Sequence, residues 1–260
     1  MTKGKRRWSG ETSYYNGRLP SLSIVIPAYN EEARLPDTLE KVLGYLDGAA
    51  WATPEVLVVD DGSRDGTAAL VEKWAARDAR VRLLRNPGNR GKGYSVKHGM
   101  LEARGEWVLF SDADLSAPIE ELGPLWTAVE RERAAVAIGS RALNRGLIGV
   151  HQSMFRETAG RFFNLVMRLV CGLPFWDTQC GFKLFCRDAA REVFSRLQLE
   201  RFGFDVEALF IARLKKYKTI EVPVRWNHAE GTKVSMFRDS LDMFLDLIRV
   251  RINQINGKYR

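Results

Sequence analysis

The sequence is poor in the residues from which disulfide-bonded and zinc-bound scaffolds are built. Its 260 residues include only three cysteines and three histidines. An odd number of cysteines without regular paired spacing argues against a disulfide framework and a zinc knuckle. The histidines lie far apart and match no metal-ligand pattern. We therefore expect free thiols in a reducing compartment at Cys171, Cys180 and Cys186.

Long apolar runs are also missing. Segments 162–176 and 241–255 are the most apolar, and charged residues such as Arg168 and Asp246 interrupt them. A helix that spans a bilayer needs about 20 predominantly apolar residues, so the sequence predicts no transmembrane helix. Residues 1–18 are basic and polar and contain no apolar stretch, which argues against a secretion signal. We expect these residues to form a flexible basic arm.

The phosphate-binding loops of common nucleotide enzymes are absent. The segment Asn89–Gly93 has neither the spacing of a Walker A loop nor the GxGxxG spacing of a dinucleotide-binding turn. It does place glycines and cations at the start of a predicted helix, which suits an anion. The formal net charge of +8 likewise favours a phosphate, a nucleic acid or an anionic lipid as partner. No recognisable nucleic-acid-binding signature supports the second of these.

Strand and helix patterns alternate along the first half of the chain. Short apolar runs predict strands at 23–26, 55–59, 81–84, 107–110 and 135–139. Helical periodicity predicts helices at 35–46, 67–77, 92–103 and 120–133. This alternation is typical of an α/β protein with a mostly parallel sheet and helices on both faces.

Polar clusters follow three of the predicted strands. Residues 29–31 follow the first strand, Asp60 and Asp61 the second, and Asp112 and Asp114 the fourth. Parallel strands bring their carboxyl ends to one edge of the sheet, where ligands bind. We expect the three clusters to meet at that edge.

The two carboxylates of Asp112 and Asp114 suit a hard divalent cation. Mg²⁺ or Mn²⁺ prefers oxygen ligands and takes part of its shell from a diphosphate and water. Acidic pairs also occur as ordinary solvated turns at strand ends, so this motif gains weight only from its position after a buried strand. By the same reasoning, Asp60 and Asp61 can contact a base and a ribose, or simply form a turn.

Two apolar helices are predicted in the second half, at 156–171 and near the C-terminus. Each carries one narrow polar stripe, such as Asp246, Arg249 and Asn253 opposite Ile248 and Ile252. Helices this apolar are usually buried in a core, and they also match helices that lie in a membrane interface. Taken singly, each helix favours core burial.

The motifs as a set resemble the family-2 inverting glycosyltransferases of GT-A fold. The matching strings are SIVIPAYNEE, VLVVDDGSRDGT, NRGKGYSVKHGM, LFSDADLS and GSR, in this order from about residue 21 to 141. Further along, DTQCGFK and EVPV are similar to the dolichyl-phosphate β-glucosyltransferases and their bacterial polyprenyl-phosphate relatives. The dolichyl-phosphate mannosyltransferases are the next most similar group.

The resemblance implies transfer of a hexose, first glucose from UDP-glucose, to a polyprenyl or dolichyl phosphate. Asp114 and Asp112 would bind Mg²⁺ or Mn²⁺, and Arg141 and Arg156 would hold the acceptor phosphate. The resemblance places seven residues in the nucleotide-sugar pocket: Pro27, Tyr29, Glu31, Asp60, Lys92, Asp112 and Lys233. Where the mannosyltransferases have a glutamine that helps to hold the metal, this chain has Ser116, which implies a looser or more hydrated metal site.

Asp177 is the candidate general base. A hydroxyl acceptor needs such a base within hydrogen-bond reach, whereas a phosphate monoester, with a second pKa of about 6, arrives largely as a dianion. For a phosphate acceptor, Asp177 would instead orient an arginine or a lysine.

The expected organisation is a basic arm (1–18), a catalytic domain (19–235) and a C-terminal amphipathic helix (236–260). The nucleotide-sugar half would end near residue 141, with the acceptor half after it. We expect a cytoplasmic protein, peripheral at the inner face of a membrane, that binds no nucleic acid. A GDP-mannose donor, a sugar-hydroxyl acceptor and a silent nucleotide-sugar or nucleic-acid binder remain the alternatives.

Overall fold

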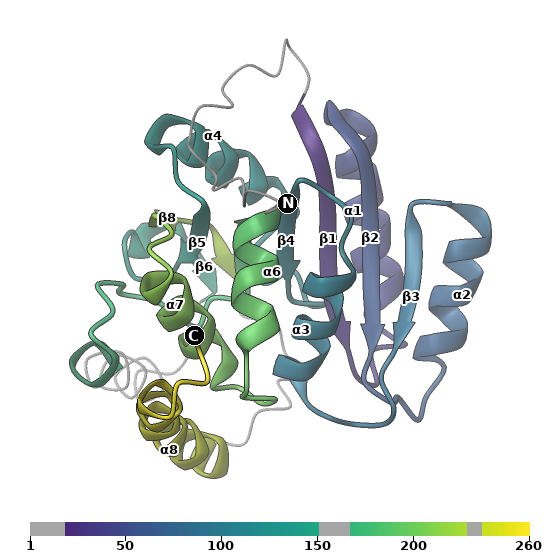
Figure 1. The fold of residues 1–260 in the computed structure, drawn as a ribbon. Helices are drawn as coiled ribbons and strands as arrows, with labels where there is room; N and C mark the ends of the chain where they lie inside the picture. The colour runs from purple at the N-terminus through teal and green to yellow at the C-terminus, as the bar shows by residue number, and fades with distance from the viewer. Residues whose placement is uncertain (1–18, 151–166, 228–235) are drawn as a thin grey trace, which may run out of the picture.

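The computed structural model describes residues 19–150, 167–227 and 236–260 (Figure 1). The basic arm predicted for 1–18 lies outside these residues, as does most of the apolar helix predicted at 156–171. Residues 167–171 are helical, as expected.

A seven-stranded sheet forms the centre of the molecule. Its strands are β1 (Leu19–Ala28), β2 (Trp51–Asp60), β3 (Val81–Arg85), β4 (Trp107–Ser111), β5 (Val136–Ser140), β7 (Phe182–Cys186) and β8 (Thr219–Pro223). The strand order is β3-β2-β1-β4-β7-β5-β8. β7 runs antiparallel to both of its neighbours, β4 and β5, whereas the other pairs are parallel. The predicted mostly parallel sheet is confirmed.

Helices cover both faces of this sheet. They are α1 (Leu35–Gly48), α2 (Thr67–Arg77), α3 (Lys92–Glu102), α4 (Leu122–Glu132), α6 (Arg187–Arg196) and α7 (Phe204–Leu214). α8 (Met236–Ile255) packs against α7. Short 3-10 turns occur at η1 (Ile119–Glu121) and η2 (Arg145–Leu147). In Figure 1, α3 and α6 cross in front of the sheet while α1 lies behind it.

A second, two-stranded sheet lies near the carboxyl end of β4. β6 (Ile148–Val150) pairs in parallel with β9 (Trp226–Asn227). The backbone N–H of Asn227 also donates to the carbonyl of Ser116, at 2.8 Å. Segments far apart in sequence are thereby joined beside the end of β4.

The central strands are buried on both faces. Residues 56–59 of β2 are fully buried, and so are Ile24, Val25 and Ile26 of β1. Continuous apolar runs are typical of strands covered by helices on both sides. Short runs of β-branched residues therefore suffice to locate these strands in the sequence.

Several strand bounds differ from the prediction, and strand β7 is not predicted at all. β1 continues through Pro27 to Ala28, because the pairing of β1 with β4 already ends at Val25 and Pro27 lies opposite Val59 of β2. A proline is tolerated where no ladder hydrogen bond needs its N–H. β7 was missed because Lys183 interrupts its apolar run.

The C-terminal helix is present, but the expectation that its apolar stripe is buried in the core is wrong. Ile248 and Ile252 of α8 are 46% and 49% exposed, whereas Asp246 of the polar stripe is only 5% exposed. Within the described ranges, no helix combines the length and the apolarity needed to cross a membrane.

Candidate functional site

The carboxyl ends of β1, β2 and β4 form one rim of the sheet. β1 lies between β2 and β4, and the chain reverses its direction of progress through the sheet between β1 and β4. Ala28 at the end of β1 lies opposite Asp60 at the end of β2. Such a reversal point is where ligands bind in open α/β sheets. The expected convergence of polar clusters is confirmed at the level of the strands.

The loop after β1 is fixed to the loop after β2. Asn30 adopts a left-handed conformation with φ of 52°, which asparagine tolerates better than most residues. Its N–H donates to Ser63 Oγ at 2.9 Å, and its Oδ1 accepts from the N–H of Arg64 at 2.8 Å. The N–H of Glu31 donates to Thr67 Oγ1 at 2.8 Å. The rim that carries Tyr29 and Glu31 is therefore rigidly held.

Asp60 and Asp61 have different roles. Asp60 accepts one backbone N–H inside its own turn. Asp61 is 4% exposed and accepts the N–H groups of Arg90 and Gly91, at 3.0 and 2.7 Å. Asp61 thus anchors the glycine-rich segment before α3. The sequence predicts only a ligand contact or a turn for this residue.

Lys92 and Asp112 form an ion pair at the centre of the rim. Lys92 is the first residue of α3, and its Nζ lies 2.6 Å from Asp112 Oδ1. Desolvation lowers the pKa of Lys92, but the carboxylates of Asp112 and Asp205 outweigh it and raise that pKa. Lys92 therefore stays cationic at the N-terminus of a helix, where an anion is also favoured.

A second ion pair lies buried beneath the first. Lys183 of β7 is 2% exposed, and its Nζ lies 2.5 Å from Asp205 Oδ1 and donates to the carbonyl of Cys180 at 2.6 Å. The Phe110 ring contacts the ammonium groups of both Lys92 and Lys183. Neither Lys183 nor Asp205 was predicted from the sequence to have a role. A lone lysine in the apolar run Phe182–Phe185 is nevertheless a signal, because a buried charge needs a partner.

The turn after β4 is shaped by a glycine of the neighbouring segment. The N–H of Asp112 donates to the carbonyl of Gly181 at 3.0 Å. A Cβ placed on Gly181 would come within 1.9 Å of Asp112 Oδ2. Leu115 takes a left-handed φ of 44° in the same turn, a conformation that costs a non-glycine residue energy and clusters at functional sites.

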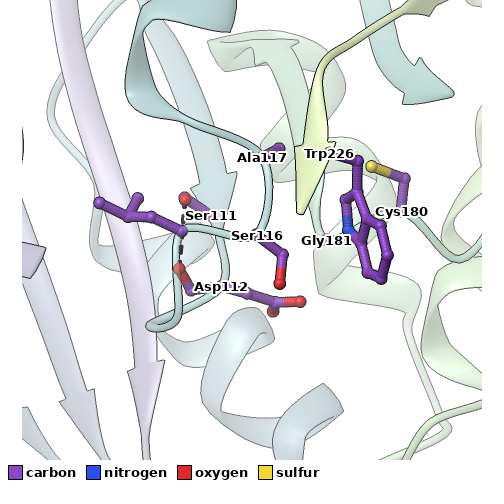
Figure 2. Close-up of a pocket in the computed structure, with 8 residues that line it drawn as sticks. Ser111, Asp112, Ser116, Ala117, Cys180, Gly181 and Trp226 are labelled. Atoms are coloured by element: carbon purple, nitrogen blue, oxygen red, sulfur yellow. Dashed lines mark hydrogen bonds between the residues drawn. The ribbon is translucent and has the colours of Figure 1, made fainter. Parts of the chain in front are cut away.

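A hollow that is open to solvent lies beside this turn, with about 190 Å³ of empty space when its open mouth is included. Figure 2 shows the side chains of Asp112 and Ser116 on one side of it and the Trp226 indole with Cys180 on the other. Burial raises the pKa of the Cys180 thiol to about 12, so this sulfur is not a nucleophile at neutral pH. All three cysteines are free, as expected, and the structure shows that they are also buried.

The donor set suits a cation that shares its ligands with a substrate. In the described ranges, no three His, Cys, Asp or Glu side chains gather in a metal-binding group. Asp112 uses Oδ1 for Lys92, and Asp114 uses Oδ1 to accept the N–H of Ser116 at 2.9 Å. One further oxygen remains on each carboxylate. Mg²⁺ is commonly bound by one or two carboxylates together with phosphate oxygens and water, so these residues fit such an ion.

Arg141 and Asp177 form a two-pronged ion pair next to the hollow. Nε and Nη2 of Arg141 donate to the two carboxylate oxygens of Asp177, at 2.6 and 2.8 Å, and the Arg141 N–H adds a third bond at 3.0 Å. Asp177 is 2% exposed, and although burial alone would raise its pKa, the Arg141 guanidinium holds that pKa below its usual value. The guanidinium also lies 5.4 Å from the Trp226 ring centroid.

A further carboxylate fixes this pair from behind. Glu221 of β8 accepts the N–H groups of Trp176 and Asp177, the latter at 2.8 Å. Because Glu221 holds the loop, the Asp177 side chain has little freedom to leave Arg141. Of the residues predicted for the site, Arg156 and Lys233 lie outside the described residues.

Comparisons with known proteins identify a matching family and similar proteins. The family described as Glycosyl transferase family 2 matches residues 23–194. The chain is 38% identical over 239 residues to a dolichyl-phosphate β-glucosyltransferase of Trichomonas vaginalis, covering 89% of this chain and 73% of that protein. It is 36% identical to the human dolichyl-phosphate β-glucosyltransferase, covering 95% of this chain and 80% of the human one.

Among solved structures, the glucosyl-3-phosphoglycerate synthase of Mycobacterium tuberculosis has a similar fold. Its complex with Mn²⁺, UDP-glucose and phosphoglyceric acid superposes with a TM-score of 0.62 at 18% identity, covering 89% of this chain and 79% of that one. At this identity the likeness concerns the fold alone.

Proposed function

The chain belongs to glycosyltransferase family 2 and is a hexosyltransferase, and on that premise we propose that it transfers glucose from UDP-glucose to dolichyl phosphate or a similar polyprenyl phosphate. The transfer would invert the anomeric carbon. The names of its relatives at 34–38% identity support glucose and dolichyl phosphate. UDP-glucose as donor is supported by a distant structural neighbour.

One observation carries the proposal: two cationic side chains each contact a residue that lines the same hollow. Lys92, at a helix N-terminus, reaches Asp112 on one side, and Arg141 lies against Trp226 on the other. A nucleotide diphosphate and an acceptor phosphate are two anions that must meet at one sugar carbon. Lys92 and Arg141 would compensate the negative charges of these two anions.

The reaction then needs positioning more than proton removal. An oxygen of the acceptor phosphate attacks the anomeric carbon, and the bond from that carbon to the donor diphosphate breaks on the opposite face. The acceptor is largely a dianion above its second pKa of about 6, so no protein base has to take a proton from it. Arg141 would neutralise the attacking phosphate, and Lys92 the departing diphosphate.

Asp112 and Asp114 would hold a divalent cation, which neutralises charge on the leaving diphosphate when bound. Pro27, Tyr29, Glu31 and Asp60 line the rim where the nucleoside would lie. Arg156 and Lys233 keep their proposed roles toward the acceptor phosphate and the donor diphosphate.

We assign Asp177 a positioning role. Both of its carboxylate oxygens are bound by Arg141, and its pKa is lowered. A general base works best with a pKa near the working pH, which this carboxylate does not have. Its function in this proposal is to aim the Arg141 guanidinium.

The proposed place of action is the cytoplasmic face of a membrane, because the acceptor is a lipid and the donor is water-soluble. The chain would attach there as a peripheral protein. The division into a nucleotide-sugar half up to residue 141 and an acceptor half after it is part of the same proposal.

The test compares acceptors. Purified protein would be given labelled UDP-glucose with dolichyl phosphate or with dolichol, in Mn²⁺ or Mg²⁺ and again with EDTA. We expect label in the lipid only with the phosphate and only with the metal, and no transfer by Asp112→Asn. Equal labelling of dolichol, or full transfer in EDTA, would contradict the proposal.

A further inference from the structure

α8 has apolar side chains on both of its faces, one against the protein and one exposed. Asp246, Leu247 and Val250 face the protein and are 5%, 2% and 0% exposed. The outer face carries large apolar side chains that are 41–80% exposed: Phe244, Leu245, Ile248, Ile252 and Ile255. At 100° per residue these five positions form one continuous stripe.

The rotation of α8 is fixed by its buried polar group. Asp246 lies against Gly203, where an added Cβ would come within 2.4 Å of Asp246 Oδ2. Gly203 is the residue that precedes the first turn of α7, and a carboxylate is stabilised at a helix N-terminus. Arg249 pairs with the same carboxylate at 2.8 Å. Turning the apolar stripe inward would break both contacts.

The C-terminal end of the chain holds α8 in the same orientation. Tyr259 is 4% exposed, and its hydroxyl donates to Glu207 of α7 at 2.6 Å. Its ring packs edge-on against Phe210, with the ring centroids 6.2 Å apart. The outward apolar stripe is therefore a property of the folded chain and not of a loosely attached helix.

A neighbouring segment adds to this surface. Cys171, at the end of the helical residues 167–171, lies near Arg251 of α8: burial raises the pKa of this thiol, and the Arg251 charge partly offsets that rise. Leu169 is 76% exposed there, and Trp176 is 56% exposed with the Arg168 guanidinium 4.1 Å from its ring centroid. Tryptophan and arginine in contact are typical of the boundary between acyl chains and headgroups.

The charges around the stripe indicate what covers it. Residues 244–260 contain a single acid, Asp246, which is buried and paired, and the four bases Arg249, Arg251, Lys258 and Arg260. These bases are exposed. A second copy of the chain would bring bases against bases, whereas anionic lipid headgroups attract them.

We propose that the outer face of α8, from Phe244 to Ile255, docks on a bilayer surface that contains anionic lipid. The helix lies in the interface with its stripe toward the acyl chains and its arginines at headgroup level. The inference deepens the proposed function, on which it rests for one point only: a lipid acceptor must reach the site from a membrane.

The test is vesicle co-sedimentation without donor or acceptor, so its outcome does not depend on the proposed reaction. The full chain would be mixed with vesicles of phosphatidylcholine alone or with phosphatidylglycerol added. We expect binding to the anionic vesicles that weakens at high salt. The double variant Ile248→Gln and Ile252→Gln should partition about tenfold more weakly, since it removes two apolar anchors.

A matched control keeps the stripe apolar. Ile248→Leu with Ile252→Leu should bind like the parent chain. Ile255→Gln, at a side chain that is 80% exposed, gives a second variant whose folding is not at risk, and it should weaken binding several-fold. Thermal unfolding confirms that each variant is folded.

Three results would overturn the docking proposal. They are no binding of the parent chain to anionic vesicles, equal binding by the glutamine and leucine variants, or a dimer in solution that the glutamine variant dissociates while vesicles stay unbound. Binding that depends on the stripe, together with no sugar transfer, would support docking and contradict the proposed reaction.

Discussion

Both carboxylate oxygens of Asp177 accept hydrogen bonds from Arg141. We therefore expect Asp177 to stay ionised at neutral pH and not to take up a proton during the reaction. Its pKa is lowered in the folded protein, so this carboxylate stabilises the fold above its unfolded pKa of about 3.9. That contribution is lost as the pH falls through the lower, folded value. Between about pH 5 and 8 the pair with Arg141 stays intact.

This pair leads to a prediction about the pH profile of transfer. We expect the acid limb to lie near pH 6, at about the second pKa of the acceptor phosphate, and to keep its position in Asp177→Asn. That variant should raise the KM for the lipid phosphate, since Arg141 is no longer aimed. If the acid limb disappeared in Asp177→Asn, Asp177 would be the general base, and its assignment as a positioning residue would be wrong.

Gly181 allows the Asp112 carboxylate to occupy its place. A Cβ at Gly181 would clash with that carboxylate, whereas a Cβ at Gly123 in α4 meets nothing within 4 Å. Gly181→Ala should therefore lower kcat/KM by at least about tenfold, which corresponds to about 1.4 kcal/mol. Gly123→Ala should leave activity unchanged and stabilise the helix by up to about 1 kcal/mol. Equal activity of both variants would show that Asp112 tolerates displacement.

The buried pair of Lys183 and Asp205 gives a stability prediction. Lys183→Met leaves Asp205 buried without its partner and should lower the free energy of unfolding by about 3–5 kcal/mol. Adding Asp205→Leu should recover most of that loss, because a buried ion pair replaced by apolar residues is often neutral. Denaturant unfolding of the parent chain and these two variants tests this. If the double variant were as unstable as the single one, the loss would not come from an unpaired buried charge, and the prediction would be wrong.

At the scale of elements, the sequence locates those whose periodicity is local. α2 is predicted at both of its ends, and β2 and β4 are found from their apolar runs. β7 is not, because its place between β4 and β5 comes from distant pairing, and its buried lysine hides the apolar pattern. The outward stripe of α8 follows from the contact of Asp246 with α7, which no helical periodicity reveals.

The same division applies to the site. Asp112, Asp114 and Lys92 are recognisable because they follow strands or begin a helix. Their partners are not recognisable, since Gly181 and Asp205 reach them only through the tertiary fold. From the sequence, Asp61 is a candidate for ligand binding. In the structure its carboxylate accepts the backbone N–H groups of Arg90 and Gly91.

The contact between Tyr259 and Glu207 joins α8 to the rest of the fold. Glu207 is fully buried and also accepts the N–H groups of Gln198 and Leu199. Tyr259→Phe removes one donor from this carboxylate, and we expect a loss of about 1–3 kcal/mol in the free energy of unfolding. Ile255→Gln, on the outer face of the same helix, should change that free energy by less than about 0.5 kcal/mol. Similar losses in both variants would contradict the stabilising role assigned to the contact between Tyr259 and Glu207.

At the scale of the whole molecule, the sheet edge and the apolar surface are connected. Glu207 holds both Tyr259 and the loop at 198–199, and Glu200 in that loop pairs with Arg90 beside the glycine-rich segment. A chain docked through α8 therefore presents its site on a rigid support. In the proposed function, one molecule binds a water-soluble donor at the sheet edge and takes its acceptor from a membrane.

The most direct test of this account offers both donors at once. UDP-glucose and GDP-mannose with different radiolabels would be incubated together with the protein, dolichyl phosphate and Mn²⁺, and the lipid would then be extracted and counted. We expect the glucose label to enter the lipid phosphate and the mannose label to stay in water. Mannose label in the lipid, or neither label there, would contradict the assignment of a glucosyltransferase that acts on a lipid phosphate.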